Sequence, residues 1–165
     1  MSEHDIHQRV KANFAILTIS DTRNEETDES GRIAKKLIDN DGHKVLAYKV
    51  IGNSKPLIQA SIDEILQDHK IDTIVTIGGT GISQRDLTIE AVSELLNKRI
   101  EGFGELFRTL SYRSVGEAAM ISRATAGTIK GKIVFCLPGS KNAVKLALIK
   151  LILPGLGHMI KEANR

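Results

Sequence analysis

The chain has 165 residues, of which 41% are hydrophobic and 26% charged, with a net charge of +3 at pH 7. This length is typical of one domain with a sizeable core, and the mild charge with only 4% aromatic residues argues against a nucleic-acid-binding surface. The polar N-terminus lacks a signal-peptide core, and no apolar run of about 18 residues predicts a membrane span. We therefore expect a cytoplasmic protein with neither nucleic-acid nor membrane partners.

The first segment, residues 1–12, is polar, and we expect it to form a flexible arm before a single domain over residues 13–165. His4 and His7 lie three positions apart, but no second ligand pair supports a metal site. Cys136 is the single cysteine, so it cannot form an internal disulfide. Its apolar neighbours predict a small core residue rather than a nucleophile.

The apolar run over residues 14–19 predicts a buried strand. It ends in Ser20, Asp21 and Thr22, whose side chains can accept from backbone amides or bind a ligand at the carboxyl end of the strand. Residues 23–30 (RNEETDES) are acidic and polar, which is typical of solvated surface, and no further role is expected for them. A helix is predicted from residues 30–31 to residues 41–42.

A second strand is predicted over residues 45–51, followed by a turn over residues 52–56 that contains Asn53. Ile58, Ile62 and Ile65 then recur at helical spacing. The alternation of strand and helix thus continues into the middle of the chain.

The segment 71–88 (IDTIVTIGGTGISQRDLT) carries the strongest functional signal. A buried strand over residues 71–77 runs into a glycine turn made by Gly78, Gly79, Thr80 and Gly81, where a ligand can approach the main chain closely. Thr88 is expected to cap a helix that continues to about residue 98. In an open α/β sheet this is where an anionic ligand binds, although the dinucleotide and P-loop fingerprints are both absent.

The last third of the chain repeats this arrangement. Residues 100–108 predict a turn leading into a helix, and residues 122–127 precede a hairpin-like turn. A buried strand over residues 133–137 then ends in Pro138, Gly139 and Ser140. The following helix is striped with apolar residues to residue 152, and we expect Pro154-Gly155 to break it before a short terminal helix.

The order of elements predicts an α/β fold in three layers: a doubly wound, mostly parallel sheet with helices on both faces. Parallel strands end on the same edge of a sheet. The turns at residues 20–22, 78–86 and 138–140 can therefore converge into one pocket, although strand order cannot be read from the sequence.

The chain resembles the MoaB/MogA family of molybdenum cofactor biosynthesis proteins, which includes the G domain of gephyrin, and is closest in wording to the MoaB branch. The matching pieces run in family order over residues 13–152 and are Ser20-Asp21-Thr22, Gly78-Gly79-Thr80-Gly81, Arg85-Asp86-Leu87-Thr88, Glu101-Gly102-Phe103-Gly104-Glu105, Ser122-Arg123 and Pro138-Gly139-Ser140. The resemblance implies a domain that binds molybdopterin, a pterin that carries a dithiolene and a terminal phosphate.

In the adenylyltransferase members, the molybdopterin phosphate attacks the α-phosphate of Mg-ATP and gives adenylyl-molybdopterin and pyrophosphate. Carried onto this chain, the resemblance implies that the glycine turn binds the phosphate. It also implies that Asp86 holds Mg²⁺ or positions the nucleotide. It gives the pterin side to Ser20, Asp21 and residues 138–140. Thr22 and Thr88 belong to the same binding set, and Arg85, Glu101, Ser122 and Arg123 are weaker candidates.

One position departs from the family. Active adenylyltransferases carry a second aspartate in the turn after the second strand, where this chain has Asn53, so its catalytic role is in doubt. Three hypotheses stay open. The first, which we favour, is a molybdopterin adenylyltransferase. The second is a MoaB-type protein that binds molybdopterin without catalysis, and the third is a competence-damage-type domain that acts on nucleotides. In the last, the glycine motif resembles Gly-Gly-Leu-Gly-Pro-Thr.

The helix over residues 141–152 is apolar on more than one face, which predicts an additional buried surface. The family forms trimers or, among MoaB types, hexamers, so we expect a homo-oligomer with the hexamer favoured. Other molybdenum cofactor biosynthesis proteins are possible partners.

Overall fold

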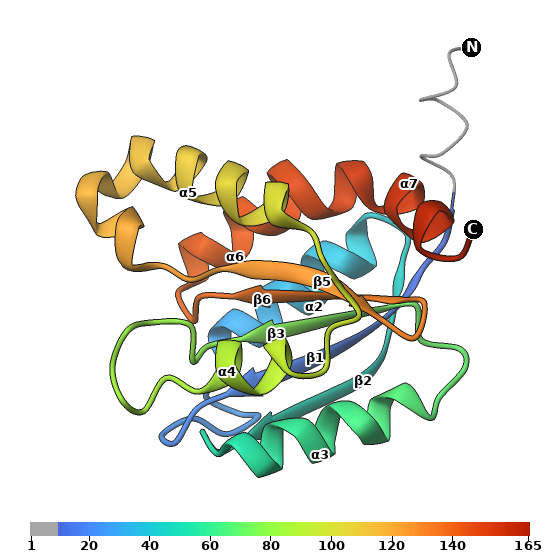
Figure 1. Cartoon of the computed structure of the whole chain (residues 1–165), viewed down its shortest axis with the longest axis horizontal. Helices are drawn as coiled ribbons and strands as arrows, with labels where there is room; N and C mark the ends of the chain where they lie inside the picture. The colour runs from blue at the N-terminus through green and yellow to red at the C-terminus, as the bar shows by residue number, and fades with distance from the viewer. Residues whose placement is uncertain (1–9) are drawn as a thin grey trace.

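Six strands form one sheet in the order β2-β1-β3-β6-β5-β4, and helices cover both of its faces (Figure 1). The structure is a computed structural model that describes residues 10–165. The strands are β1 (Asn13–Ile19), β2 (Lys44–Ile51), β3 (Thr73–Ile77), β4 (Lys98–Arg99), β5 (Thr125–Ile129) and β6 (Lys132–Leu137). The helices are α2 (Glu29–Asn40), α3 (Lys55–Leu66), α4 (Thr88–Ser93), α5 (Glu101–Val115), α6 (Lys141–Ala147) and α7 (Leu153–Ala163).

The N-terminal arm predicted over residues 1–12 falls mostly outside the described residues, as do His4 and His7. At its end, Ala12 is fully buried, and its carbonyl accepts from the backbone N–H of Lys44 at 3.1 Å. Ala12, the last residue of the predicted arm, is therefore part of the packed core.

The central strands are parallel. β1 pairs in parallel with β2 and β3, and β3 pairs in parallel with β6, whereas β5 runs antiparallel to β6 and to β4. The carboxyl ends of β1, β2, β3 and β6 consequently lie along one edge of the sheet. The predicted doubly wound, mostly parallel α/β architecture is confirmed.

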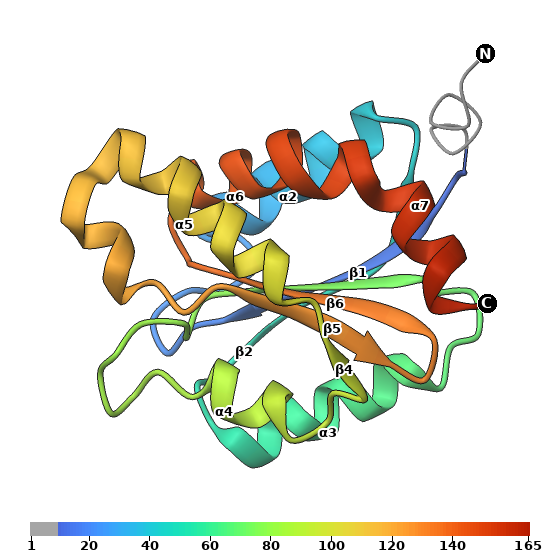
Figure 2. The same cartoon turned by 45° about the horizontal axis from the view of Figure 1, so that its top comes forward.

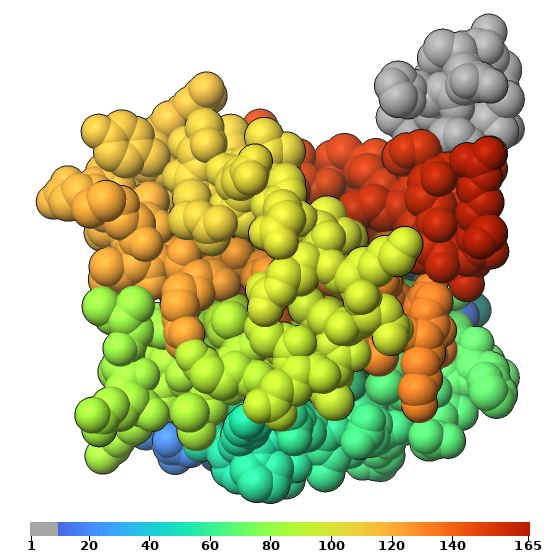
Figure 3. Space-filling view, in the orientation of Figure 1, coloured from blue at the N-terminus to red at the C-terminus, as the bar shows by residue number. Residues whose placement is uncertain are grey.

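Two aliphatic cores lie on the two faces of the sheet. Helices α2, α5, α6 and α7 pack on one face, and α3 and α4 pack on the other, as the turned view shows (Figure 2). All four phenylalanines join in the first core, where the rings of Phe103 and Phe135 meet edge to face with centroids 5.1 Å apart. In the view of Figure 3, side chains of the segment from α4 to α5 cover much of the sheet between the two helical layers.

The helix expected over residues 88–98 ends early, at Ser93. The chain turns instead into β4, where Asn97 N donates to Thr128 O and Ile100 N donates to Ala126 O, both at 2.8 Å. A Cβ at Gly127 would clash with the Lys98 carbonyl oxygen, so this glycine permits the close approach of β4. Pairing with β5 ends the helix before its sequence pattern does.

The break expected at Pro154-Gly155 is also wrong. A π-helical turn, η2 (Leu148–Ile152), joins α6 to α7, and Pro154 takes one of the first two positions of α7. Pro154 lies just after this π-helical turn, where the regular i→i−4 hydrogen-bond ladder is already interrupted, and the helical segment continues through it.

The continuous segment Lys141–Ala163 is long and apolar enough, by length and composition alone, to cross a membrane, although the sequence predicted no such segment. One side of it packs into the core, through Val144, Leu148, Ile152 and Leu156. The apolar side chains on that side therefore belong to the protein core.

Candidate functional site

A pocket of about 380 Å³ lies at the edge of the sheet where β1, β3 and β6 end. It brings together the three turns that the sequence analysis singled out. The predicted site residues that line it are Ser20, Thr22, Gly78, Gly79, Thr80, Gly81, Asp86, Ser122, Pro138 and Gly139. A side chain that the sequence analysis left without a role, Arg23, lines it too, with Ile19, Ala118 and Ile121.

The glycine turn is shaped by its own backbone. Gly78 has φ +101° and Gly79 has φ +70°, and a Cβ at Gly79 would clash with the Thr88 hydroxyl. That hydroxyl donates to Gly78 O at 2.8 Å, so Thr88 is buried and does not face the pocket. Thr88 was expected to cap α4, but the N-cap is Leu87 because the threonine side chain serves the turn instead.

The backbone amides of the glycine turn differ in whether they have a hydrogen-bond acceptor within the protein. Gly78 N donates to Leu137 O at 2.9 Å, which joins β3 to β6. Within residues 10–165, the N–H groups of Gly79, Thr80 and Gly81 donate to no protein acceptor. Successive amides without a protein acceptor leave N–H donors available to an anion.

Asp86 lies at the end of the same loop and is half-buried. Its Oδ2 accepts from the backbone N–H of Ser83 at 3.0 Å, and a Cβ at Gly81 would lie 2.7 Å from that same oxygen. Asp86 is therefore not a helix cap, which was the alternative weighed from the sequence. It closes the loop on itself and, of the lining residues that the structure describes, is the one carboxylate.

Arg123 holds this loop from outside the pocket. Its Nε donates to Gly81 O at 2.8 Å, its Nη2 donates to Asp86 O at 3.2 Å, and its guanidinium pairs with the Glu90 carboxylate. The pairing with Arg123 lowers the pKa of Glu90. Arg108 plays a similar part nearby, because its Nη1 donates to the carbonyls of Ser122 and Ala124 at 3.3 and 3.0 Å.

The turn after β1 is built around Ser20, whose Oγ accepts from the backbone N–H groups of Thr22 and Arg23 at 3.2 and 3.1 Å. The turn after β6 begins α6, since the Ser140 Oγ accepts from Ala143 N at 3.2 Å. Ser140 lines a separate groove beside α5 and α6, and not the pocket. The pocket therefore takes Pro138 and Gly139 from this turn and leaves out the predicted Ser140.

Other predicted residues also lie elsewhere. The Arg85 and Glu101 side chains are exposed and do not line the pocket. Asp21 and Asn53 lie beside it and bond to each other. Of the weaker candidates, Ser122 is in the wall.

Comparison with known proteins agrees with this geometry. A family model described as "Probable molybdopterin binding domain" matches residues 15–158. The chain is 49% identical, over 100% of its length and 98% of the relative, to "Molybdenum cofactor biosynthesis protein B" of Bacillus cereus. A crystal structure of a protein of the same name has a TM-score of 0.91 and 50% identity, covering 94% of this chain and 98% of that one.

The chain belongs to the MoaB/MogA family of molybdenum cofactor biosynthesis proteins. A more distant member, the tungsten cofactor synthesizing protein MoaB from Pyrococcus furiosus, has a TM-score of 0.85 and 36% identity, covering 94% of this chain and 98% of that one. The shared fold thus extends to a protein that is named for tungsten cofactor synthesis.

The metal implied for the family's adenylyltransferases can be tested against the donors present. Within residues 10–165 no group of three or more His, Cys, Asp or Glu side chains could hold a metal ion. Mg²⁺ retains waters and binds through one or two carboxylates together with substrate phosphates. The donor set fits only that minimal mode, in which Asp86 would be the single protein ligand.

The prediction for residues 23–30 was wrong in part. They were expected to be solvated surface, but Asp28 and Ser30 are buried. Asp28 is the N-cap of α2, with Oδ1 accepting from Gly31 N at 3.0 Å. An aspartate just ahead of an apolar-periodic helix is an N-cap signal, and the surrounding charges hid it.

Proposed function

We propose that this protein binds molybdopterin in the pocket at the ends of β1, β3 and β6, and acts in molybdenum cofactor biosynthesis. The observation that carries the proposal is the meeting of three strand-end turns around one hollow of about 380 Å³. Membership of the MoaB/MogA family supports the same ligand.

The chemistry of the pocket fits a phosphorylated pterin. The unpaired N–H groups of Gly79, Thr80 and Gly81 offer donors to a terminal phosphate. The Ser20 and Thr22 hydroxyls supply further polar groups to the wall. These main-chain donors keep their positions because Thr88 and Arg123 fix the loop.

Adenylyl transfer is the second candidate. Asp86 at the pocket favours it, because phosphoryl-type transfer needs positioning and charge neutralisation rather than a covalent nucleophile. Asn53 opposes it, because the position lacks the negative charge that would help to hold Mg²⁺ next to a triphosphate. With one carboxylate in the wall, the residues favour binding over turnover.

The binding proposal is tested by incubating the pure protein with molybdopterin and separating free from bound pterin by ultrafiltration. We expect retention at a stoichiometry of one per chain, and strongly reduced retention in Gly79→Ala. Failure of the wild-type protein to retain molybdopterin would reject the proposal. Adding Mg-ATP and measuring pyrophosphate then decides between the enzyme and the binding protein.

We also propose that the chain works as a homo-oligomer, with a hexamer favoured over a trimer. Exposed apolar side chains support this, among them Tyr112 (63% exposed), Val115 (53%), Met120 (76%) and Ile149 (48%). They lie on α5, on η1 (Gly116–Ile121) and in η2, and Val115 and Ile149 line the groove that Ser140 also lines. Light scattering that returns the mass of one chain at micromolar concentration would contradict this proposal.

A further inference from the structure

Arg23 reaches the pocket from the loop after β1. Among the described residues that line the pocket it is the one lysine, arginine or histidine, and its side chain is 39% exposed. It therefore supplies the positive charge of a wall otherwise made of glycines, hydroxyls, apolar groups and Asp86. Any anion that enters the pocket meets this guanidinium.

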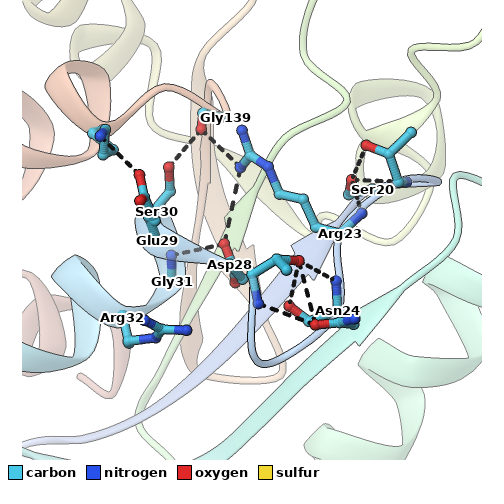
Figure 4. A network of polar contacts seen from close by, with 12 residues as sticks. Ser20, Arg23, Asn24, Asp28, Glu29, Ser30, Gly31, Arg32 and Gly139 are labelled. Atoms are coloured by element: carbon cyan, nitrogen blue, oxygen red, sulfur yellow. Dashed lines mark hydrogen bonds and ion pairs between the residues drawn. The ribbon is translucent and has the colours of Figure 1, made fainter.

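The guanidinium is held in place from behind. Its Nη1 donates to Gly139 O at 3.2 Å and lies 3.9 Å from Oδ1 of Asp28 (Figure 4). The same carbonyl of Gly139 accepts from Ser30 Oγ at 2.7 Å. Figure 4 shows the Arg23 side chain lying between the Gly139 carbonyl and the Asp28 carboxylate, which ties the turn after β6 to the start of α2.

Asp28 is itself fixed. Its side chain is fully buried, and its two oxygens accept from Gly31 N at 3.0 Å and from the Tyr48 hydroxyl at 2.5 Å. A buried carboxylate is costly without hydrogen bonds and a nearby cation. Among residues 10–165, Arg23 is the cation within ion-pair distance, so a series of contacts from Tyr48 through Asp28 to Arg23 runs from β2 to the pocket wall.

The guanidinium keeps donors to spare. Within residues 10–165 its Nε and Nη2 donate to no acceptor, since both contacts of the side chain use Nη1. Arginine presents its donors in a planar fork that matches a phosphate group in bidentate geometry. A guanidinium anchored on one side and free on the other is arranged to receive an anion.

We propose that Arg23 binds the phosphate group of the ligand in this pocket, and that Asp28 and Tyr48 are positioning residues that orient its guanidinium. The inference rests on the proposed function for the identity of the pterin. The phosphate belongs either to the pterin or to a nucleotide, and the two sources share the same recognition chemistry. The experiment below separates them.

The test compares Arg23→Met with the wild-type protein against molybdopterin, its dephosphorylated form, ATP and inorganic pyrophosphate. If the pterin phosphate is the group bound, the Kd for molybdopterin rises by about tenfold to a hundredfold, as for a lost charged hydrogen bond, and the Kd for the dephosphorylated form stays unchanged. A rise for ATP alone assigns Arg23 to a nucleotide phosphate. Equal binding of every phosphorylated probe by both proteins would overturn the inference.

Two further variants separate recognition from folding. Arg23→Lys keeps the charge but loses the fork, and we expect it to recover part of the lost affinity for phosphorylated ligands only. Tyr48→Phe still packs against the core but cannot donate to Asp28. We expect it to raise the Kd for phosphorylated ligands several-fold and to leave the Kd for the dephosphorylated pterin unchanged. A loss that is equal for phosphorylated and dephosphorylated pterin would show a merely structural role and overturn the proposal.

The failure of the proposed function is distinguishable from the failure of this inference. A wild-type protein that retains neither form of the pterin rejects molybdopterin as the ligand. The pyrophosphate arm then still tests Arg23, because weaker pyrophosphate binding in Arg23→Met supports the anion role and unchanged binding rejects it.

Discussion

The backbone N–H of Asn53 donates a 2.8 Å hydrogen bond to Oδ1 of Asp21, and so joins the turn after β2 to the turn after β1. The side chain of Asn53 continues the link, since its Oδ1 accepts from Leu87 N at 3.3 Å. Position 53 thus connects three strand-end segments beside the pocket. Asn53, which departs from the family pattern, therefore has a structural role that is separate from any role in catalysis.

Replacing Asn53 by aspartate is expected to preserve this bridge, because a carboxylate oxygen can accept from Leu87 N as the amide oxygen does. If the missing charge limits adenylyl transfer, Asn53→Asp will raise Mg-ATP-dependent pyrophosphate release by about tenfold or more over wild type. Asn53→Ala is the matched control: it loses the bond, costs about 1 kcal/mol of unfolding free energy, and gains no activity. Identical turnover in Asn53→Asp and wild type would remove charge at this position as the explanation.

The glycine turn should tolerate a Cβ less well than another left-handed glycine. Gly42 has φ +87° with nothing within 4 Å of a Cβ, whereas a Cβ at Gly79 (φ +70°) would clash with the Thr88 hydroxyl. We expect Gly42→Ala to cost about 1 kcal/mol from backbone strain alone, and Gly79→Ala to cost about 3 kcal/mol from strain and clash together. Urea unfolding measures both, and equal costs would mean that the Thr88 contact is unimportant.

The contribution of Glu90 to stability should depend on pH. Arg123 lowers the pKa of this carboxyl below its ordinary value of 4.5. A lowered acid pKa stabilises the folded state above the ordinary value, and this stabilisation is lost as pH falls through the folded pKa. The Glu90 side chain is 43% exposed, so the effect is modest.

This dependence is measurable by unfolding wild type and Glu90→Gln from pH 7 down to acid pH. We expect wild type to be the more stable at pH 7 and the difference to shrink as pH falls below 4.5. A difference that is independent of pH would contradict the pairing. Arg123→Met should lose both the pair and the bonds to the loop carbonyls, at a cost of about 1–3 kcal/mol.

Tyr48 should resist ionisation. Burial and the hydrogen bond to Asp28 raise the pKa of its phenol well above the ordinary value of 10.0. The chain has two tyrosines, so in Tyr112→Phe the only tyrosinate absorbance comes from Tyr48. We expect no ionisation near pH 10 in the folded variant and normal ionisation in denaturant. An ordinary titration in the folded state would show that Tyr48 does not donate to Asp28.

Much of the fold follows from local patterns. The apolar runs at β1, β3 and β6 are almost fully buried strands, and such runs are typical of the centre of a parallel sheet. The places where the sequence misled, the end of α4 and the passage through Pro154, are places where distant pairing or an altered helical turn overrides local preference. Local propensity cannot register a partner strand that lies far away in the chain.

The site divides in the same way. The glycine turn and its neighbour Asp86 were recognisable because their spacing within one loop fixes their geometry. Arg23 was not, because its meaning depends on Gly139, which lies 116 positions away in the chain. A charged residue in an acidic run looks solvated until the tertiary structure brings a carbonyl and a buried carboxylate to it.

The sequence by itself determined the alternation of strands and helices, the parallel sheet and the three turns at its edge, because each depends on periodicity or on glycine over a few neighbouring residues. Only the tertiary structure decided which side chains face the pocket. In it, the Ser140 and Thr88 hydroxyls form hydrogen bonds with the backbone, and Arg23 lies in the pocket wall. The physical reason is that a hydroxyl or guanidinium takes whichever partners the packed chain places within reach, and those partners come from distant segments.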